Sequence, residues 1–116
     1  MNIEEIRIYC LKKAAVTECF PFDELSLVFK VANKMFALSA LEKPSNIVLK
    51  CDPERALQLR ETYSEIEGAY HMNKTMWNQI ALQGNVPDKL IIELIDHSYD
   101  LVVSKLSKKD RISFGL

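Results

Sequence analysis

The chain has 116 residues, 48% of them hydrophobic, and a net charge of −1. A chain of this length forms one domain that buries roughly two-thirds of its unfolded surface, so it needs no metal or disulfide to fold. The first residues lack the basic and apolar regions of a signal peptide, and no apolar run is long enough to cross a membrane. We therefore expect a single domain over residues 1–116 that is soluble, cytoplasmic and without a membrane partner.

The three cysteines, Cys10, Cys19 and Cys51, are odd in number and widely spaced. This pattern argues against a disulfide framework and fits a reducing compartment. No two cysteines form a CxxC pair, and His71 and His97 do not form an HxxxH pair, so local spacing indicates no metal site. We expect neither a metal nor a cofactor.

Charge is distributed unevenly along the chain. Residues 26–51 and 105–116 each carry a net charge of +3, whereas residues 52–68 and 87–104 each carry −3. If the basic residues lie in a sheet and the acidic residues in helices, the domain has two sides of different charge. A local positive field can then attract an anionic partner although the total charge is close to zero.

The N-terminal segment is expected to form an amphipathic helix over about residues 3–15. Asn2 and Glu5 have the spacing of a capping box, and apolar residues then recur at helical intervals. Pro21 interrupts the following segment and forces Phe20 toward an extended conformation. We expect Phe20 and Phe22 to cover the core from a loop.

Three strands are expected next. Residues 25–31 alternate with period two, with Leu25 on the apolar face, and residues 34–40 and 47–51 are further apolar strands. Ala32-Asn33 can form a tight turn between the first two strands because Asn tolerates positive φ. The result is a hairpin followed by a third antiparallel strand.

A helix is expected over about residues 53–66, because Asp52 can cap it and Pro53 fits its first position. Alternation returns from Thr75 to Leu82, and a last helix runs from residue 88 to about 106, before a basic tail that we expect to be frayed. The order α-β-β-β-α-β-α is typical of a two-layer α+β domain with helices on one face of a mainly antiparallel sheet.

Ser98 interrupts the apolar face of the last helix. We interpret it as structural, with its hydroxyl bonded to a carbonyl one turn earlier or reaching into the core. His97, beside it, is interpreted as a surface or helix-capping residue.

The chain resembles the MmcQ/YjbR family of small bacterial proteins over about residues 18–102. The matching segments are Phe20-Pro21-Phe22-Asp23, Val28-Phe29-Lys30-Val31, Lys34-Met35-Phe36-Ala37, Leu49-Lys50-Cys51-Asp52-Pro53-Glu54, Tyr70-His71-Met72-Asn73-Lys74 with Trp77, and Ser98-Tyr99. The resemblance implies a compact α+β fold likened to the frataxin-like and secretion-chaperone folds, and a DNA-binding role through a double-wing arrangement. Where members of the family often have a histidine just before the tryptophan, this chain has Met76.

Strand alternation places Lys30, Lys50, Trp77 and Gln79 together on the sheet face that the helices leave free, with Lys34 near the end of the hairpin. Lysines can contact phosphates, and a flat ring can stack on a base or sugar. This face is therefore a candidate nucleic-acid surface, with DNA as the first partner. The alternatives are a protein-interaction or chaperone-like module that uses the same face, or lysines that serve only solubility.

The segment from Tyr70 to Trp77 concentrates polar and aromatic side chains. Tyr70, His71, Asn73 and Lys74 would form the rim of the same surface, or a hydrogen-bonded corner between a helix and a strand. His71 could in principle transfer protons near neutral pH, but the sequence places no activated nucleophile or paired carboxylate beside it. We therefore expect a non-enzymatic binding protein.

Overall fold

The first helix, α1 (Ile3–Leu11), begins with the capping box expected from the sequence. The Asn2 side chain accepts a hydrogen bond from the Glu5 N–H at 2.8 Å, and the Glu5 carboxylate accepts one from the Asn2 N–H at 3.1 Å. This computed structural model describes residues 1–43, 45–69 and 72–116. Within them, α1 buries Ile6 and Cys10, one turn apart, in the core.

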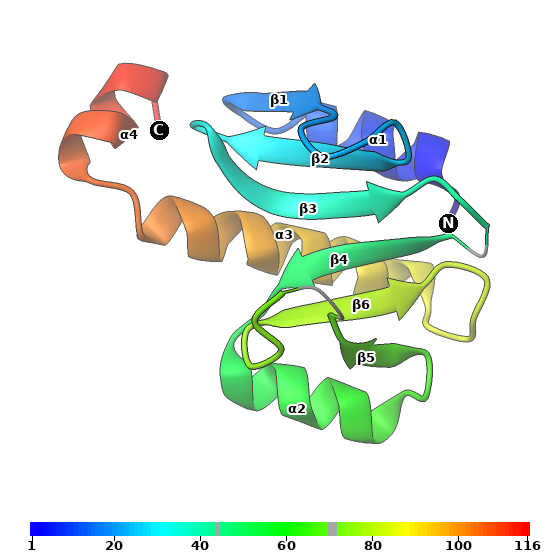
Figure 1. Ribbon diagram of the computed structural model, residues 1–116. Helices are drawn as coiled ribbons and strands as arrows, with labels where there is room; N and C mark the ends of the chain where they lie inside the picture. Colours follow the sequence, from blue (N-terminus) through cyan, green and yellow to red (C-terminus); the bar gives the residue numbers. More distant parts are fainter. Residues whose placement is uncertain (44, 70–71) are drawn as a thin grey trace.

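A single antiparallel sheet has the strand order β1-β2-β3-β4-β6-β5 (Figure 1). Its strands are β1 (Val16–Cys19), β2 (Ser26–Val31), β3 (Lys34–Ala40), β4 (Asn46–Lys50), β5 (Ile66–Gly68) and β6 (Trp77–Ala81). The four inner strands are those expected from the sequence. Both edge strands were missed, because segments of four and three residues are too short to show an alternating pattern.

The hairpin between β2 and β3 turns at Ala32-Asn33, as expected. Both residues have positive φ, 48° and 66°, which is what a two-residue hairpin turn of type I′ requires. Val31 pairs with Lys34 on either side of the turn. The tight-turn prediction is therefore confirmed.

A bulge shapes the beginning of β3. Phe29 pairs with Ala37 and Lys30 pairs with Met35, so Phe36 is the extra residue on β3. The ladder between β3 and β4 includes only Ala37 to Ala40, and the first three residues of β3 have no partner on β4. The two strands diverge at this end, as Figure 1 shows.

Three helices follow the first one: α2 (Pro53–Thr62), α3 (Asp88–Ser104) and α4 (Lys108–Phe114). The Asp52 carboxylate accepts a hydrogen bond from the Arg55 N–H at 3.2 Å, and Pro53 is the first residue of α2, which confirms the predicted helix start. The helix ends four residues earlier than expected, because Tyr63 has an extended backbone.

The prediction of a frayed basic tail was wrong. The Ser107 side chain accepts a hydrogen bond from the Asp110 N–H at 3.1 Å and starts α4, which ends at Gly115 with φ of 70°. A serine followed three residues later by an acid is itself a helix-start signal. This short helix extends beyond the end of the sheet in Figure 1.

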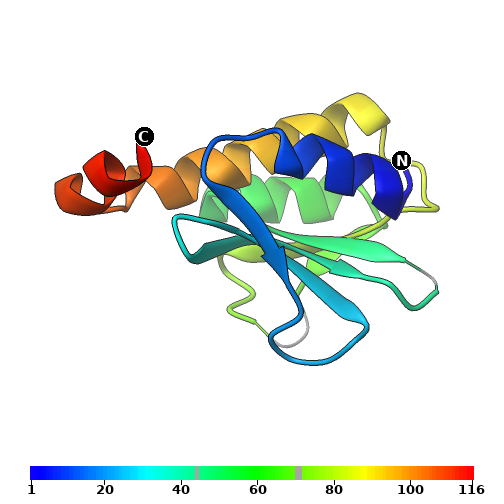
Figure 2. The ribbon, with the colours of Figure 1, turned by 90° about the horizontal axis from the view of Figure 1, so that it is seen from above.

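The helices α1, α2 and α3 lie on one side of the sheet, and the other side is open (Figure 2). This confirms the predicted two-layer α+β architecture. The core fills the space between the layers with apolar side chains, among them Ile6, Phe29, Phe36, Ile47 and Ile95. No helix in the described part of the chain is long and apolar enough to span a membrane.

Two aromatic residues expected to cover the core do not do so. Phe20 and Phe22 are 51% and 70% exposed in the loop between β1 and β2, and Leu25 is 49% exposed because β2 begins only at Ser26. The helices and inner strands already fill the core, so this loop lies outside it.

Ser98 joins α3 to the two diverging strands. Its hydroxyl donates a hydrogen bond to the Phe36 carbonyl of β3 at 2.5 Å and accepts one from the Lys50 N–H of β4 at 2.9 Å. The side chain is fully buried. Ser98 therefore has the structural role expected, but its partners are strand backbone groups 62 and 48 residues away rather than its own helix.

The neighbouring Tyr99 strengthens the same junction. Its ring packs edge-on against Phe36 with 5.4 Å between ring centroids, and its hydroxyl donates to the Ala14 carbonyl at 2.7 Å. Ser98-Tyr99 thus links α3 to β3, to β4 and to the segment after α1.

Replacing Ser98 by alanine should destabilise the protein by about 2 kcal/mol or more, because two backbone groups lose their partner in a buried place. Urea denaturation would measure the free energy of unfolding. Ser104→Ala is the matched control, since the Ser104 hydroxyl is exposed and bonds only to Leu101 in its own helix. It should cost less than about 0.5 kcal/mol. Equal effects of the two substitutions would contradict the proposed role of Ser98.

Candidate functional site

The open face of the sheet consists of the strand residues that point away from the helices. Core residues such as Phe29, Leu49 and Ile80 mark the covered face, and their neighbours along each strand point to the other one. The register then assigns to the open face Thr17, Ser26, Val28, Lys30, Met35, Leu38, Val48, Lys50, Trp77 and Gln79.

Lys50 and Trp77 are direct cross-strand partners on β4 and β6. Val48 and Gln79 form the next pair on the open face. Side chains of such pairs have Cβ atoms about 4.5–5.5 Å apart, so Lys50 and Trp77 are neighbours on the open face. The indole side chain of Trp77 is half-buried.

Lys30 lies on the same face, two strands away from Lys50. It pairs with Thr17 on β1 and Met35 on β3. The shared face inferred from alternation is therefore confirmed for Lys30, Lys50, Trp77 and Gln79. Glu67 on the edge strand β5 also belongs to this face, opposite Gln79, and adds one negative charge at its border.

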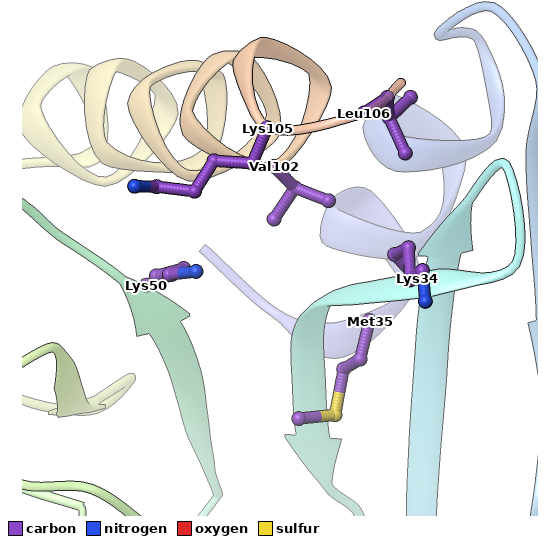
Figure 3. Close-up of a pocket in the computed structure, with 6 residues that line it drawn as sticks. All are labelled: Lys34, Met35, Lys50, Val102, Lys105 and Leu106. Atoms are coloured by element: carbon purple, nitrogen blue, oxygen red, sulfur yellow. The ribbon is translucent and has the colours of Figure 1, made fainter. Parts of the chain in front are cut away.

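Lys34 occupies a different position. It pairs with Val31, whose side chain is in the core, so Lys34 leaves the strand on the helix side, at the hairpin end expected from the sequence. There it lies near the C-terminal end of α3 (Figure 3).

The proposed rim falls partly outside the described residues: Tyr70 and His71 are not among them. Asn73 stabilises the turn before β6, since its side chain accepts from the Thr75 N–H at 2.9 Å. The Lys74 carbonyl accepts a hydrogen bond from the Arg60 side chain at 2.8 Å, which ties this turn to α2. Asn73 and Lys74 thus have structural contacts at the beginning of β6, next to Trp77.

A hollow of about 540 Å³ lies over the middle of the open face. We call it the apolar hollow; its lining includes Phe22, Met35, Leu38, Val48 and Met72. Strand alternation pointed to the strand residues, but Phe22 and Met72 come from loops and were not predicted to join them. The Phe20-Pro21-Phe22 segment, one of the segments that match the family, was the sequence signal that could have indicated a role for Phe22 at this surface.

A second, smaller pocket of about 240 Å³ lies where β3 and β4 diverge (Figure 3). We call it the lysine pocket; it is lined by Lys34, Met35, Lys50, Val102, Lys105 and Leu106. Lys105 extends from the end of α3 toward the end of β4, where Lys50 lies. Lys105 was not among the predicted site residues, although it begins the basic segment 105–116.

Two cysteines and one histidine outside the open face have structural surroundings. Burial raises the pKa of the Cys10 thiol to about 12 and also raises that of Cys51, which keeps both thiols neutral. Among the described residues, no group of three His, Cys, Asp or Glu side chains is arranged to hold a metal ion. His97 accepts a hydrogen bond from the Asp52 N–H through Nε2 at 3.1 Å, so it supports the start of α2.

A sequence model of the YjbR family matches residues 11–101. The chain belongs to the YjbR family. Two relatives are the uncharacterised Escherichia coli proteins YjbR, 32% identical over 96% of this chain and 95% of its own length, and YbdF, 35% identical over 93% and 89%. Both are similar to this chain over nearly its whole length.

Solved structures show the same YjbR-like fold. The Deinococcus radiodurans protein DR2400, with a domain designated DUF419, is 38% identical and has a TM-score of 0.93 over 99% of this chain and 88% of its own. A Pseudomonas syringae protein is 29% identical with a TM-score of 0.77 over 87% of this chain and 98% of its own. The Deinococcus radiodurans and Pseudomonas syringae proteins therefore share this two-layer fold.

The contact between His97 and Asp52 predicts a pH dependence of stability. Burial, and then the positive charge of Arg55, lower the pKa of His97 below its ordinary value of 6.5. The unfolded chain therefore takes up a proton at a higher pH than the folded one, and the free energy of unfolding should fall as the pH drops from 7.5 through 6.5. Urea denaturation between pH 7.5 and 5.5 measures this loss.

In the His97→Gln variant, the free energy of unfolding should fall less over the same pH interval, because glutamine keeps a hydrogen-bond acceptor but does not titrate. An identical pH dependence for the two proteins would show that His97 is not the group responsible.

Proposed function

We propose that the protein binds nucleic acid, with DNA as the first candidate, through the open face at the ends of β4 and β6. The observation that carries this proposal is the direct pairing of Lys50 with Trp77, the single tryptophan of the chain, on a face without helices. A lysine and a tryptophan on neighbouring strands of one face suit a nucleic-acid strand, since lysine meets the phosphate and the indole ring stacks on a base.

The charge distribution supports this orientation. The inner strands and their loops, residues 26–51, carry +3, and the segment after α3, residues 105–116, carries another +3. The segments 52–68 and 87–104, which contain α2 and α3, carry −3 each, and both helices lie on the covered side. Of the basic residues, Lys30 and Lys50 lie on the open face with Glu67 at its border, so a polyanion approaching this face meets a local positive charge.

We propose that this surface binds a ligand without transforming it. The described polar side chains of the open face are mainly lysines, amides and hydroxyls, and none of them forms a nucleophile–base pair of the kind that covalent catalysis uses. A cytoplasmic location fits the three free thiols, Cys10, Cys19 and Cys51.

The apolar hollow favours a second candidate function, a protein-interaction module. Leu38, Val48 and Met35 line it together with the exposed Phe22. Apolar side chains of a partner would bury this surface, and such binding should persist at high salt because it does not depend on counterion release. Salt dependence therefore separates the two candidates.

Binding of a short single-stranded DNA, monitored by quenching of Trp77 fluorescence, should weaken steeply between about 50 and 200 mM salt. Lys30→Ala and Lys50→Ala should each reduce the slope of log K against log salt concentration by about one unit, because each removes one phosphate contact.

Lys89→Ala is the matched control for this titration. Lys89 is exposed near the start of α3, on the helix side of the molecule, and its loss should leave the slope unchanged. Absence of DNA binding at low salt, or an equal effect of all three substitutions, would contradict the proposed surface.

A further inference from the structure

The lysine pocket lies between the diverging strands β3 and β4 and is not a shallow depression on the open face of the sheet. Beyond the Ala37–Leu49 pair, β3 and β4 no longer form a ladder, and α3 lies beneath the opening. Val102 near the end of α3 and Leu106 just after this helix form its apolar wall, and the pocket has a volume of about 240 Å³. A phosphate group with part of its substituent fits this volume.

Charge in this pocket is of one sign. Lys34, Lys50 and Lys105 come from β3, β4 and the end of α3, and all three line the same space (Figure 3). None of the six lining residues is acidic, and no ion pair links these lysines to a described carboxylate. Three like charges around one pocket repel each other, and a bound anion with two negative charges would remove that repulsion.

We propose that the lysine pocket binds a phosphate monoester, that is, a terminal phosphate with two negative charges. Lysine is a common phosphate ligand that acts as a point charge with three donors. A monoester carries two negative charges and one substituent, whereas a phosphodiester within a strand carries one negative charge and two substituents for which the opening must have room.

Two sources supply this chemistry: the phosphorylated end of a nucleic-acid strand, or a small phosphorylated molecule. The first rests on the function proposed above, with the open face holding the strand and the lysine pocket its end. The second is independent of it. The experiment therefore uses small probes and oligonucleotides as separate arms.

The small-probe arm compares methyl phosphate with dimethyl phosphate by calorimetry and by NMR shifts of the protein amides. Methyl phosphate should bind at least about tenfold more tightly, because the diester has one charge less and loses at least one charge-assisted hydrogen bond. Lys105→Met and Lys34→Met should each weaken methyl phosphate binding about tenfold or more, while keeping the apolar stem.

Lys89→Met is the matched control: it removes the same charge from the other end of the same helix and should have no effect. Lys30→Met removes a lysine of the open face that does not line the pocket, and it should also leave methyl phosphate binding unchanged. All four lysines are half-buried or exposed, and circular dichroism verifies that each variant is folded.

The oligonucleotide arm compares one single strand with a 5′-phosphate and with a 5′-hydroxyl group. A preference for the 5′-phosphate that Lys105→Met abolishes assigns the nucleic-acid end as a ligand. Methyl phosphate binding without any DNA binding supports the pocket as a small-molecule site and contradicts the function proposed above. Equal binding of the monoester and the diester, or equal effects of Lys105→Met and Lys89→Met, would overturn the proposed phosphate site even if DNA binds elsewhere.

Discussion

The structure depends on the hydrogen bonds of three consecutive backbone N–H groups at and just after the end of β4, those of Lys50, Cys51 and Asp52. Because β3 diverges from β4 before Lys50, a neighbouring strand does not satisfy the Lys50 N–H. Ser98 of α3 accepts from it, the Met76 carbonyl accepts from Cys51 at 2.7 Å, and His97 accepts from Asp52. Unpaired backbone groups in such a place are costly. Two adjacent side chains of one helix thus hold the end of β4 and the beginning of α2.

This constraint also creates the candidate sites. The same Ser98 hydroxyl binds the Phe36 carbonyl, so both strands are anchored to α3 while a gap stays open between them. Lys50, fixed at the edge of that gap, has Trp77 on one side and the lysine pocket on the other. Met35 lines both the lysine pocket and the apolar hollow, so the two are adjacent. Lys50 therefore has two roles: its backbone N–H helps to anchor β4 to α3, and its side chain belongs to both proposed binding sites.

Local signals in the sequence were sufficient for much of the fold. The Asn2–Glu5 capping box, the Ala32-Asn33 turn and the Asp52-Pro53 helix start each depend on residues a few positions apart, and alternation placed Lys30, Lys50 and Trp77 on one face. Features that depend on distant residues were not predictable in this way. The Phe36 bulge, the partners of Ser98, and the meeting of Lys105 with Lys34 and Lys50 arise only when α3 packs under the diverging strands. The loop residues Phe22 and Met72 reach the apolar hollow for similar reasons.

Both binding proposals place an anionic ligand where β4, β6 and the end of α3 meet. Amide chemical-shift mapping during titration with a 5′-phosphorylated oligonucleotide tests this placement most directly, because every non-proline residue reports separately. We expect the largest shifts at Lys50, Trp77 and Lys105, smaller ones at Lys30 and little change along α2. Shifts confined to α1 and α2, or no shifts at low salt, would contradict this placement.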